Sequence, residues 1–173
     1  MRAIAREAGC SPAKPYSYFD GKKGILAATR ARCFEDFSDF VEYRLEDVEG
    51  AEPRLLAQAR AYVEFARRWP QSFKIMFDFR LADEEDYPEL RSSVRRSWSL
   101  LRSSVQAALD AGVVEGDGDD LAHLMWSGLH GIAALENSGA PGPDWDADRL
   151  TIPMIEALID AHRPESNDIK RQD

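Results

Sequence analysis

A short N-terminal stretch holds the side chains whose types and spacing best match one kind of chemistry, which is contact with DNA. Lys22 carries positive charge that suits phosphates, and Tyr16 and Tyr18 carry hydroxyls that can reach phosphate oxygens. Ala13 and Lys14 would lie at the N-terminal end of a helix, which is the end that meets base edges in the major groove. The sequence therefore predicts a surface on which two side chains face bases and three hold phosphates.

Two short helices around a tight turn would position these side chains. The first is predicted by an apolar face at i, i+1 and i+4, formed by Ile4, Ala5 and Ala8. Gly9 tolerates the left-handed conformation that ends a helix. Ser11 would then cap a second helix that begins at Pro12, whose missing N–H costs nothing at the first helical position. Two helices joined by such a turn make a helix-turn-helix.

Pro15 is expected to disturb the second helix. It would be the fourth helical residue, where it removes the first intrahelical hydrogen bond and crowds the carbonyl of Ser11. A proline in a helix interior costs about 3 kcal/mol, and one in the first turn costs less. The second helix is therefore expected to start late or to be distorted.

The charge of the chain is unevenly distributed. The net charge is −9, which taken as a whole argues against a nucleic-acid partner. Residues 1–32, however, hold seven basic and two acidic side chains, whereas the rest of the chain holds 15 basic and 29 acidic ones. A basic first segment on an acidic body is typical of a chain whose first segment meets phosphates.

The composition limits the class of protein. A chain of 173 residues is long enough for one large or two small domains with a core. It contains no run of 18 apolar residues and no apolar segment of a signal peptide, so no membrane span is predicted. Cys10 and Cys33 both occupy apolar positions of helical patterns. Two buried thiols are favoured over a disulfide or a redox switch, and a cytoplasmic location fits.

Helical periodicity runs through the remainder of the chain. Apolar residues recur at steps of three and four, which predicts helices over residues 22–47, 55–69, 88–111, from Asp117 or Asp119 to 135, and within 146–162. An apolar segment at 73–81 and an acidic turn at 83–86 precede the third of these. Pro153 either kinks the last helix or marks its start, and a kink is favoured. No segment alternates like a strand, so the fold is predicted to be all-α.

The N-terminal stretch resembles the DNA-binding segment of the tetracycline-repressor (TetR) family. The shared positions keep the spacing of that family: Ile4, Ala5, Ala8, Gly9, Ser11, Tyr16, Tyr18, Phe19 and Lys22. The resemblance implies a homodimer that binds a palindromic double-stranded DNA operator. In that family a further helix precedes this stretch, and the sequence, which begins at Met1 within the second helix, is expected to lack it. Pro15 stands where the family carries a buried Leu or Ile.

The body carries a second resemblance. Residues 126–132 resemble the Trp…His-Gly (WHG) signature of one TetR C-terminal domain type, and residues 69–77 are similar to its Pro-x-x-Tyr/Phe-x-x-Met-Phe segment. The resemblance implies a pocket in each subunit for a small effector, which an apolar or aromatic molecule would suit. The residues expected to bind it are large and apolar or aromatic: Trp69, Phe73, Met76, Phe77, Trp98, Leu101, Met125, Trp126 and His130.

Two alternatives for these side chains stay open. Each of these residues could fill the core instead of contacting an effector. Four aromatic residues and two methionines are, however, many for one helical core. His130 lies beside Gly131 on an otherwise apolar helix. It would either hydrogen-bond a buried group of the protein or contact the effector, and the sequence favours neither.

The helix that ends near residue 135 is predicted to serve two purposes. Its apolar stripe is expected to face inward, with Leu121, Leu124, Met125, Gly128, Leu129, Ile132 and Leu135. Small residues on the same helix would allow close approach of another helix, namely Ser127, Gly128, Gly131 and Ala134. As the resemblance implies, the last two helices of two copies would form a four-helix dimer interface.

These observations give one principal hypothesis and one rival. The chain is expected to divide into a DNA-binding segment with its connecting helix (1–47), a ligand-binding and dimerisation domain (48–163) and a disordered tail (164–173). It would be a repressor that an effector releases from DNA. The rival is a dimeric small-molecule-binding protein that no longer binds DNA, because the first helix is missing and Pro15 distorts the recognition helix.

No catalytic, cofactor or metal site is predicted. Neither a glycine-rich phosphate loop nor a spaced Ser–His–Asp or Cys–His set is present in the sequence. Asp119 and His123 stand four residues apart, but a third ligand in register is missing. A capping carboxylate beside an exposed histidine is the favoured interpretation of that pair. The sequence identifies neither the effector nor the operator, nor whether the protein represses or activates.

Overall fold

The computed structural model of the protein describes residues 2–77, 85–139, 142 and 144–165. These residues form seven α-helices and one short 3-10 helix, with no strand among them, which confirms the all-α prediction. None of these helices is long and apolar enough to cross a membrane. Most of the predicted tail, and two residues of the acidic turn at 83–86, lie outside the described residues.

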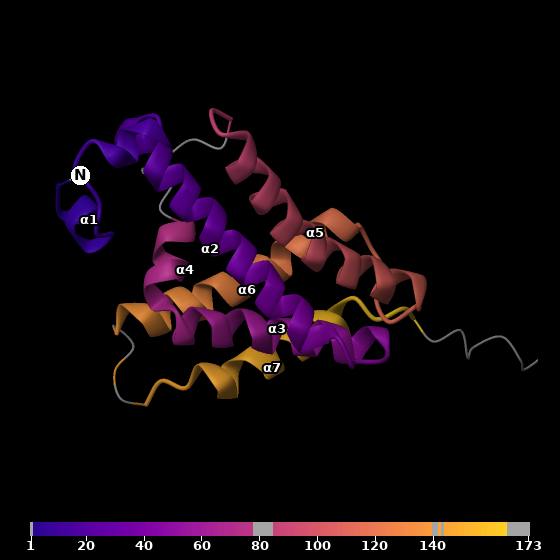
Figure 1. Ribbon diagram of the computed structural model, residues 1–173. Coiled ribbons are helices and arrows are strands. Elements are labelled where there is room, and N and C mark those ends of the chain that lie inside the picture. The colour runs from indigo at the N-terminus through magenta and orange to yellow at the C-terminus, as the bar shows by residue number, and fades with distance from the viewer. Residues whose placement is uncertain (1, 78–84, 140–141, 143, 166–173) are drawn as a thin grey trace, which may run out of the picture.

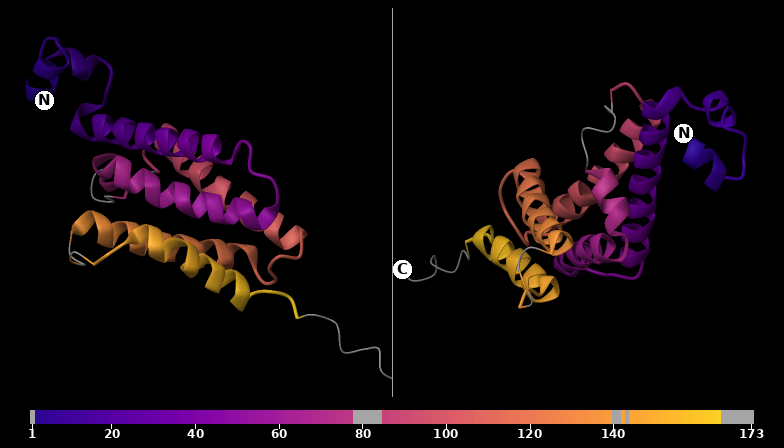
Figure 2. Two further views of the ribbon diagram at one scale, coloured as in Figure 1. Left: turned by 90° about the horizontal axis from the view of Figure 1, so that it is seen from below. Right: turned by 90° about the vertical axis from the view of Figure 1, so that its left-hand side faces the viewer.

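One helix forms the centre of the body. The elements are α1 (Arg2–Glu7), a 3-10 helix (Lys14–Ser17), α2 (Gly21–Leu45), α3 (Ala51–Arg68), α4 (Pro70–Met76), α5 (Pro88–Asp110), α6 (Gly118–Ser138) and α7 (Ala147–Ala161). Helix α3 contacts α2, α4, α5, α6 and α7. Figure 2 shows α3 between α2 on one side and the α6–α7 pair on the other. Figure 1 shows α1 standing apart from this body, at the start of α2.

Local signals in the sequence set the ends of the long helices. Helix α5 is followed by Gly112 with φ 66°, a left-handed conformation that glycine adopts without steric cost. The carboxylate of Asp117 caps α6 by accepting hydrogen bonds from the N–H groups of Asp119 and Asp120 at 2.9 and 3.0 Å. Helix α7 begins before Pro153 and continues through it, so Pro153 does not mark its start.

The second helix of the predicted helix-turn-helix differs from expectation. No α-helix begins at Pro12, and Ser11 is not its cap. Instead, Lys14–Ser17 form a single 3-10 turn, and the N–H of Lys14 donates to the carbonyl of Ser11 at 3.0 Å. The cause is Pro15, which has no N–H to donate to Ser11 in the α-helical pattern. The expected distortion by Pro15 is therefore present.

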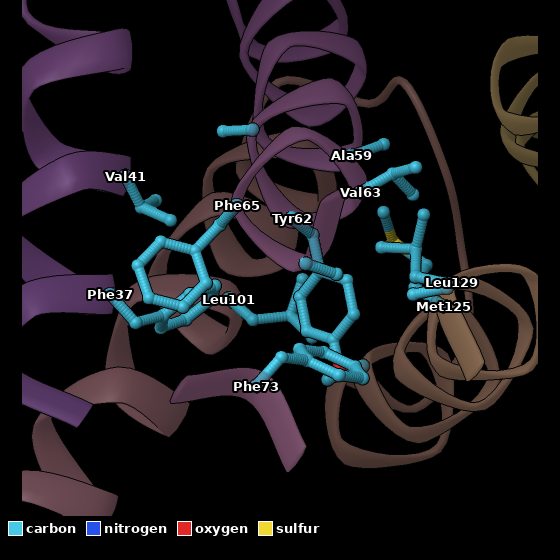
Figure 3. Packing of buried hydrophobic residues seen from close by; sticks show 14 of the residues in the cluster. Phe37, Val41, Ala59, Tyr62, Val63, Phe65, Phe73, Leu101, Met125 and Leu129 are labelled. Carbon is cyan, nitrogen blue, oxygen red and sulfur yellow. The ribbon is translucent and has the colours of Figure 1, made fainter. Parts of the chain in front are cut away.

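An aromatic cluster joins α3 to its neighbours. Figure 3 shows Phe65 pointing from α3 toward Phe37 of α2, and Tyr62 pointing from α3 toward Phe73 of α4 beneath it. The ring of Phe37 meets the rings of Phe65 and Tyr62 edge-on, with centroids 5.2 and 5.5 Å apart. Edge-to-face pairs of this kind add stability beyond the area that they bury. The cluster fixes α3 against the helix that leads to the N-terminal segment.

Three burial predictions are wrong. Leu124 and Leu135, which were expected to face inward on α6, are 47% and 46% exposed. Helix α6 is apolar on two faces, and only one of them packs against α3, α5 and α7. Cys10 is half-buried, whereas Cys33 is buried as expected. Cys10 lies just after α1, which stands apart from the body and covers little of it.

Candidate functional site

A cavity of about 230 Å³ lies between α2, α3, α5 and α6, with the end of α4 as a further wall. Its lining is almost wholly apolar and aromatic: Phe34, Phe37, Gln58, Tyr62, Met76, Phe77, Val94, Ser97, Trp98, Leu101, His123, Trp126 and Leu129. No Asp, Glu, Lys or Arg side chain is among these lining residues. Such a site suits an apolar molecule that a few polar groups orient.

The structure brings five of the nine predicted ligand residues together. They are Met76, Phe77, Trp98, Leu101 and Trp126, which all line the cavity. Trp69 instead lies partly exposed against Phe40 and Phe65. Met125 lines a separate, much smaller cavity between α3, α5, α6 and α7.

Phe73 and His130 lie beside the lining of the cavity rather than in it. The ring of His130 stacks on Phe73 at 5.3 Å and meets the edge of Phe77 at 4.5 Å. Its Nδ1 lies 3.0 Å from the hydroxyl of Tyr62. The structure thus gives His130 a hydrogen-bond partner inside the protein.

Tyr62 and His130 form a hydrogen-bonded pair at one wall. Burial raises the pKa of Tyr62, so its hydroxyl keeps its proton, and burial lowers the pKa of His130, so its imidazole is held neutral. The hydroxyl oxygen of Tyr62 and Nδ1 of His130 share one hydrogen bond of 3.0 Å. This pair uses the hydroxyl of Tyr62 within the protein itself.

Sequence reasoning missed Gln58 and Tyr62 as lining residues. They stand four residues apart on α3, so they share one face of that helix. The sequence signal was a glutamine beside an apolar stripe, but the burial that gives this glutamine its meaning is visible only in the fold. The rotation of α3 that brings this face onto the cavity depends on tertiary packing.

The five residues predicted to contact DNA all lie on the surface. Ala13, Lys14, Tyr16, Tyr18 and Lys22 are exposed, within or beside the 3-10 turn and at the start of α2. They lie at the end of the molecule where the N-terminal segment projects (Figure 1). This surface is accessible, although a 3-10 turn stands where the second helix was predicted.

The Asp119–His123 pair has partners of its own. The carboxylate of Asp119 pairs with Arg102 at 2.6 Å, and Nδ1–H of His123 donates to the backbone carbonyl of Asp119 at 2.7 Å. Among the described residues, no group of three or more His, Cys, Asp or Glu is placed to hold a metal ion.

His130 gives the fold a predicted dependence on pH. The pKa of His130 in the folded protein lies below its value of 6.5 in the unfolded chain. Once the pH falls below 6.5, the unfolded chain therefore binds more protons than the folded protein. The free energy of unfolding is therefore expected to decline as the pH is lowered from 6.5 toward the folded pKa. Urea denaturation of wild type and His130→Gln between about pH 7.5 and 5.5 measures this, and His123→Gln is an exposed control. If the free energy of unfolding of His130→Gln declined with falling pH as steeply as that of wild type, the prediction would be contradicted.

The comparisons with known proteins agree with this architecture. One similar solved structure is that of a protein with unknown function from Rhodococcus sp. RHA1, whose sequence is 26% identical to this chain. The two structures match with a TM-score of 0.82, over 94% of this chain and 84% of that one. The TetR family transcriptional regulator PfmR from Thermus thermophilus is 17% identical, with a TM-score of 0.70 over 92% of this chain and 86% of that one. The latter likeness concerns the fold alone.

Sequence families give a more specific result. No curated protein matches the chain. Residues 55–158, more than half of the chain, match the family described as "Tetracyclin repressor-like, C-terminal domain". The matched range includes most of the lining of the cavity as well as the exposed face of α6. On this evidence the chain belongs to the tetracyclin repressor-like (TetR) family.

Proposed function

We propose that the protein is a ligand-responsive transcriptional regulator that binds a palindromic operator as a homodimer in the cytoplasm. A small apolar or aromatic effector in the cavity would release it from DNA. The observation that carries this proposal is that Phe34 and Phe37 of α2 form part of the cavity wall. Helix α2 leads directly to the basic N-terminal segment, so an effector in the cavity would touch the helix that holds the segment proposed to contact DNA.

Release would follow from a change in the position of α2. An effector between Phe37 of α2 and Trp126 of α6 would favour one spacing of these helices, and in a dimer that spacing sets the distance between the two N-terminal segments. Such coupling is a difference in effector affinity between two geometries, typically about 1–3 kcal/mol. It requires no contact between effector and DNA. We assign the body to the WHG type of C-terminal domain on the residues of α6 that carry that signature.

The dimer would form through α6 and α7. One face of α6 leaves Leu124 and Leu135 exposed, with Ser127, Gly131 and Ala134 on the same exposed side. Gly128 is turned instead toward α7, where an added Cβ would lie 2.7 Å from Sδ of Met154. Apolar and small residues on one helical face suit a self-complementary contact between two copies. Such a contact would place two N-terminal segments on half-sites one DNA turn apart.

Within the N-terminal segment, Ala13 and Lys14 would face bases, and Tyr16, Tyr18 and Lys22 would hold phosphates. The test is fluorescence anisotropy with duplex DNA from the region upstream of the protein's own gene, measured across a salt series. Tight, salt-dependent binding that exceeds binding to scrambled duplex supports the proposal. Equal binding to both duplexes contradicts it.

Lys22→Ala is expected to weaken binding to all DNA sequences by a similar factor. A side chain that holds phosphate contributes one released counterion, so the slope of log K against log salt should fall by roughly one. Lys74→Ala is the matched control, because Lys74 is an exposed lysine on α4 in the body of the protein. A change in sequence preference at an unchanged slope would show that Lys22 contacts bases instead.

The rival function is a dimeric effector-binding protein that does not read DNA. One observation favours it, namely that residues 14–17 form only a single 3-10 turn in place of a recognition helix. Pro15→Leu restores the N–H that an α-helix needs at this position. If wild type fails to discriminate operator from scrambled DNA and Pro15→Leu does discriminate, the proline has disabled the reading segment and the rival function is correct for the natural chain.

A further inference from the structure

Gln58 is a polar residue of the cavity wall with an unpaired buried oxygen. It is 6% exposed, and its Oε1 has no hydrogen-bond partner among the described residues. An unpaired buried acceptor is costly, because folding removes it from water without replacing the lost hydrogen bond. The carboxamide lines the cavity, so a molecule bound there could supply the missing partner.

Other polar groups of the lining are already engaged. The hydroxyl of Tyr62 is hydrogen-bonded to Nδ1 of His130, and the hydroxyl of Ser97 donates to the carbonyl of Val94 at 2.9 Å. His123 donates to the backbone of its own helix. Among the described lining residues, the oxygen of the Gln58 carboxamide is the buried polar atom that has no hydrogen-bond partner.

Charge and size narrow the class of ligand. None of the described lining residues is Asp, Glu, Lys or Arg, so a charged ligand would lose its hydration without gaining an opposite charge. The cavity of about 230 Å³ is larger than the roughly 150 Å³ apolar cavity that accommodates one benzene ring in another protein. Its volume and its aromatic walls suit two fused rings.

We propose that the effector is a neutral aromatic molecule of about two rings that carries one hydroxyl, and that Gln58 selects it by a hydrogen bond to that hydroxyl. A hydroxyl both donates and accepts, so it pairs with the oxygen or the nitrogen of a carboxamide. This inference rests on the proposed function, because it takes the cavity to be the effector site. It adds the chemistry by which one residue distinguishes the effector from a plain hydrocarbon.

The test compares three probes that share one ring system: naphthalene, 2-naphthol and 2-naphthoate. Equilibrium dialysis gives the Kd of each for wild type, for Gln58→Met and for Ser97→Ala. Methionine nearly matches glutamine in length but offers neither the carbonyl nor the NH₂ group. Ser97→Ala is the matched control, because Ser97 lines the same cavity but its hydroxyl is already bonded to Val94.

The decisive quantity is the ratio of the naphthalene Kd to the 2-naphthol Kd. Gln58→Met is expected to lower this ratio about tenfold relative to wild type, whereas Ser97→Ala should leave it unchanged. In wild type, 2-naphthoate should bind at least about tenfold more weakly than 2-naphthol, because the cavity offers no countercharge. Gln58→Leu gives the same comparison if Gln58→Met fails to fold.

The possible failures separate the two proposals. Suppose that naphthalene and 2-naphthol bind wild type, but that the ratio of their Kd values is the same in the variants at position 58 as in wild type. The role of Gln58 is then overturned, and the cavity remains an effector site. If 2-naphthoate binds as tightly as 2-naphthol, the neutral class is overturned. If none of the probes binds wild type, the effector site itself is overturned together with this inference.

Discussion

Phe65→Ala is expected to lower the free energy of unfolding by about 3–5 kcal/mol, as replacements of fully buried phenylalanines do. Phe65 is 2% exposed and lies on α3, which contacts all the other helices of the body. Its ring centroid lies 5.2 Å from that of Phe37 and 5.0 Å from that of Trp69. Alanine would leave a void at the centre of this cluster. Urea denaturation followed by circular dichroism measures the loss.

Tyr43→Ala is the matched control for this prediction. Tyr43 is an aromatic residue of α2 that is 71% exposed, so its removal should change the free energy of unfolding by no more than about 0.5 kcal/mol. A similar small loss in Phe65→Ala would mean that the neighbouring rings repack into the void. The aromatic cluster would then not hold α2 against α3.

The helices of the body follow from short-range signals in the sequence. Apolar periodicity predicted one helix over residues 22–47 and another over 88–111, and the structure has Gly21–Leu45 and Pro88–Asp110. Glycine after a helix, aspartate before one and proline at a first position each act within a single turn. Such signals depend on the backbone of a few neighbouring residues, so no tertiary information is needed to interpret them.

The recognition helix shows the limit of a pattern match. The spacing of the N-terminal residues indicated two α-helices, but the missing N–H of Pro15 allows only a 3-10 turn at Lys14–Ser17. The same local rule that makes helix starts predictable also predicts this departure. A resemblance specifies a fold only where each residue can adopt the required backbone.

The candidate site was predicted only in part because it depends on how helices are rotated about their axes. Periodicity assigns a residue to an apolar face, but α6 has two such faces, and Leu124 lies on the one left exposed. Met125 and Trp126 are adjacent in sequence but line different cavities. Gln58 was overlooked because a polar residue in an apolar stripe acquires meaning only when the opposite wall is known.

Arg30→Met is expected to lower the free energy of unfolding by about 2–4 kcal/mol and to weaken the coupling between effector and DNA. Arg30 is a fully buried residue of α2, and its Nε and Nη2 donate to the carbonyl of Met76 at 3.3 and 3.0 Å. Met76 is the last residue of α4 and lines the cavity, so this contact joins the cavity wall to the helix that leads to the proposed DNA-binding segment. Methionine fills part of the space but leaves that carbonyl without these donors.

Arg32→Met separates this contact from a general effect of losing an arginine on α2. Arg32 is an exposed arginine two residues further along, and its ion pair with Asp36 at 2.7 Å is a surface pair worth little. Urea denaturation should show a large loss for Arg30→Met and almost none for Arg32→Met. In anisotropy measurements with 2-naphthol present, DNA release should be retained in Arg32→Met and reduced in Arg30→Met. Full release of DNA by a folded Arg30→Met protein would mean that the effector acts on α2 through Phe34 and Phe37 alone. These two side chains line the cavity, whereas Arg30 does not.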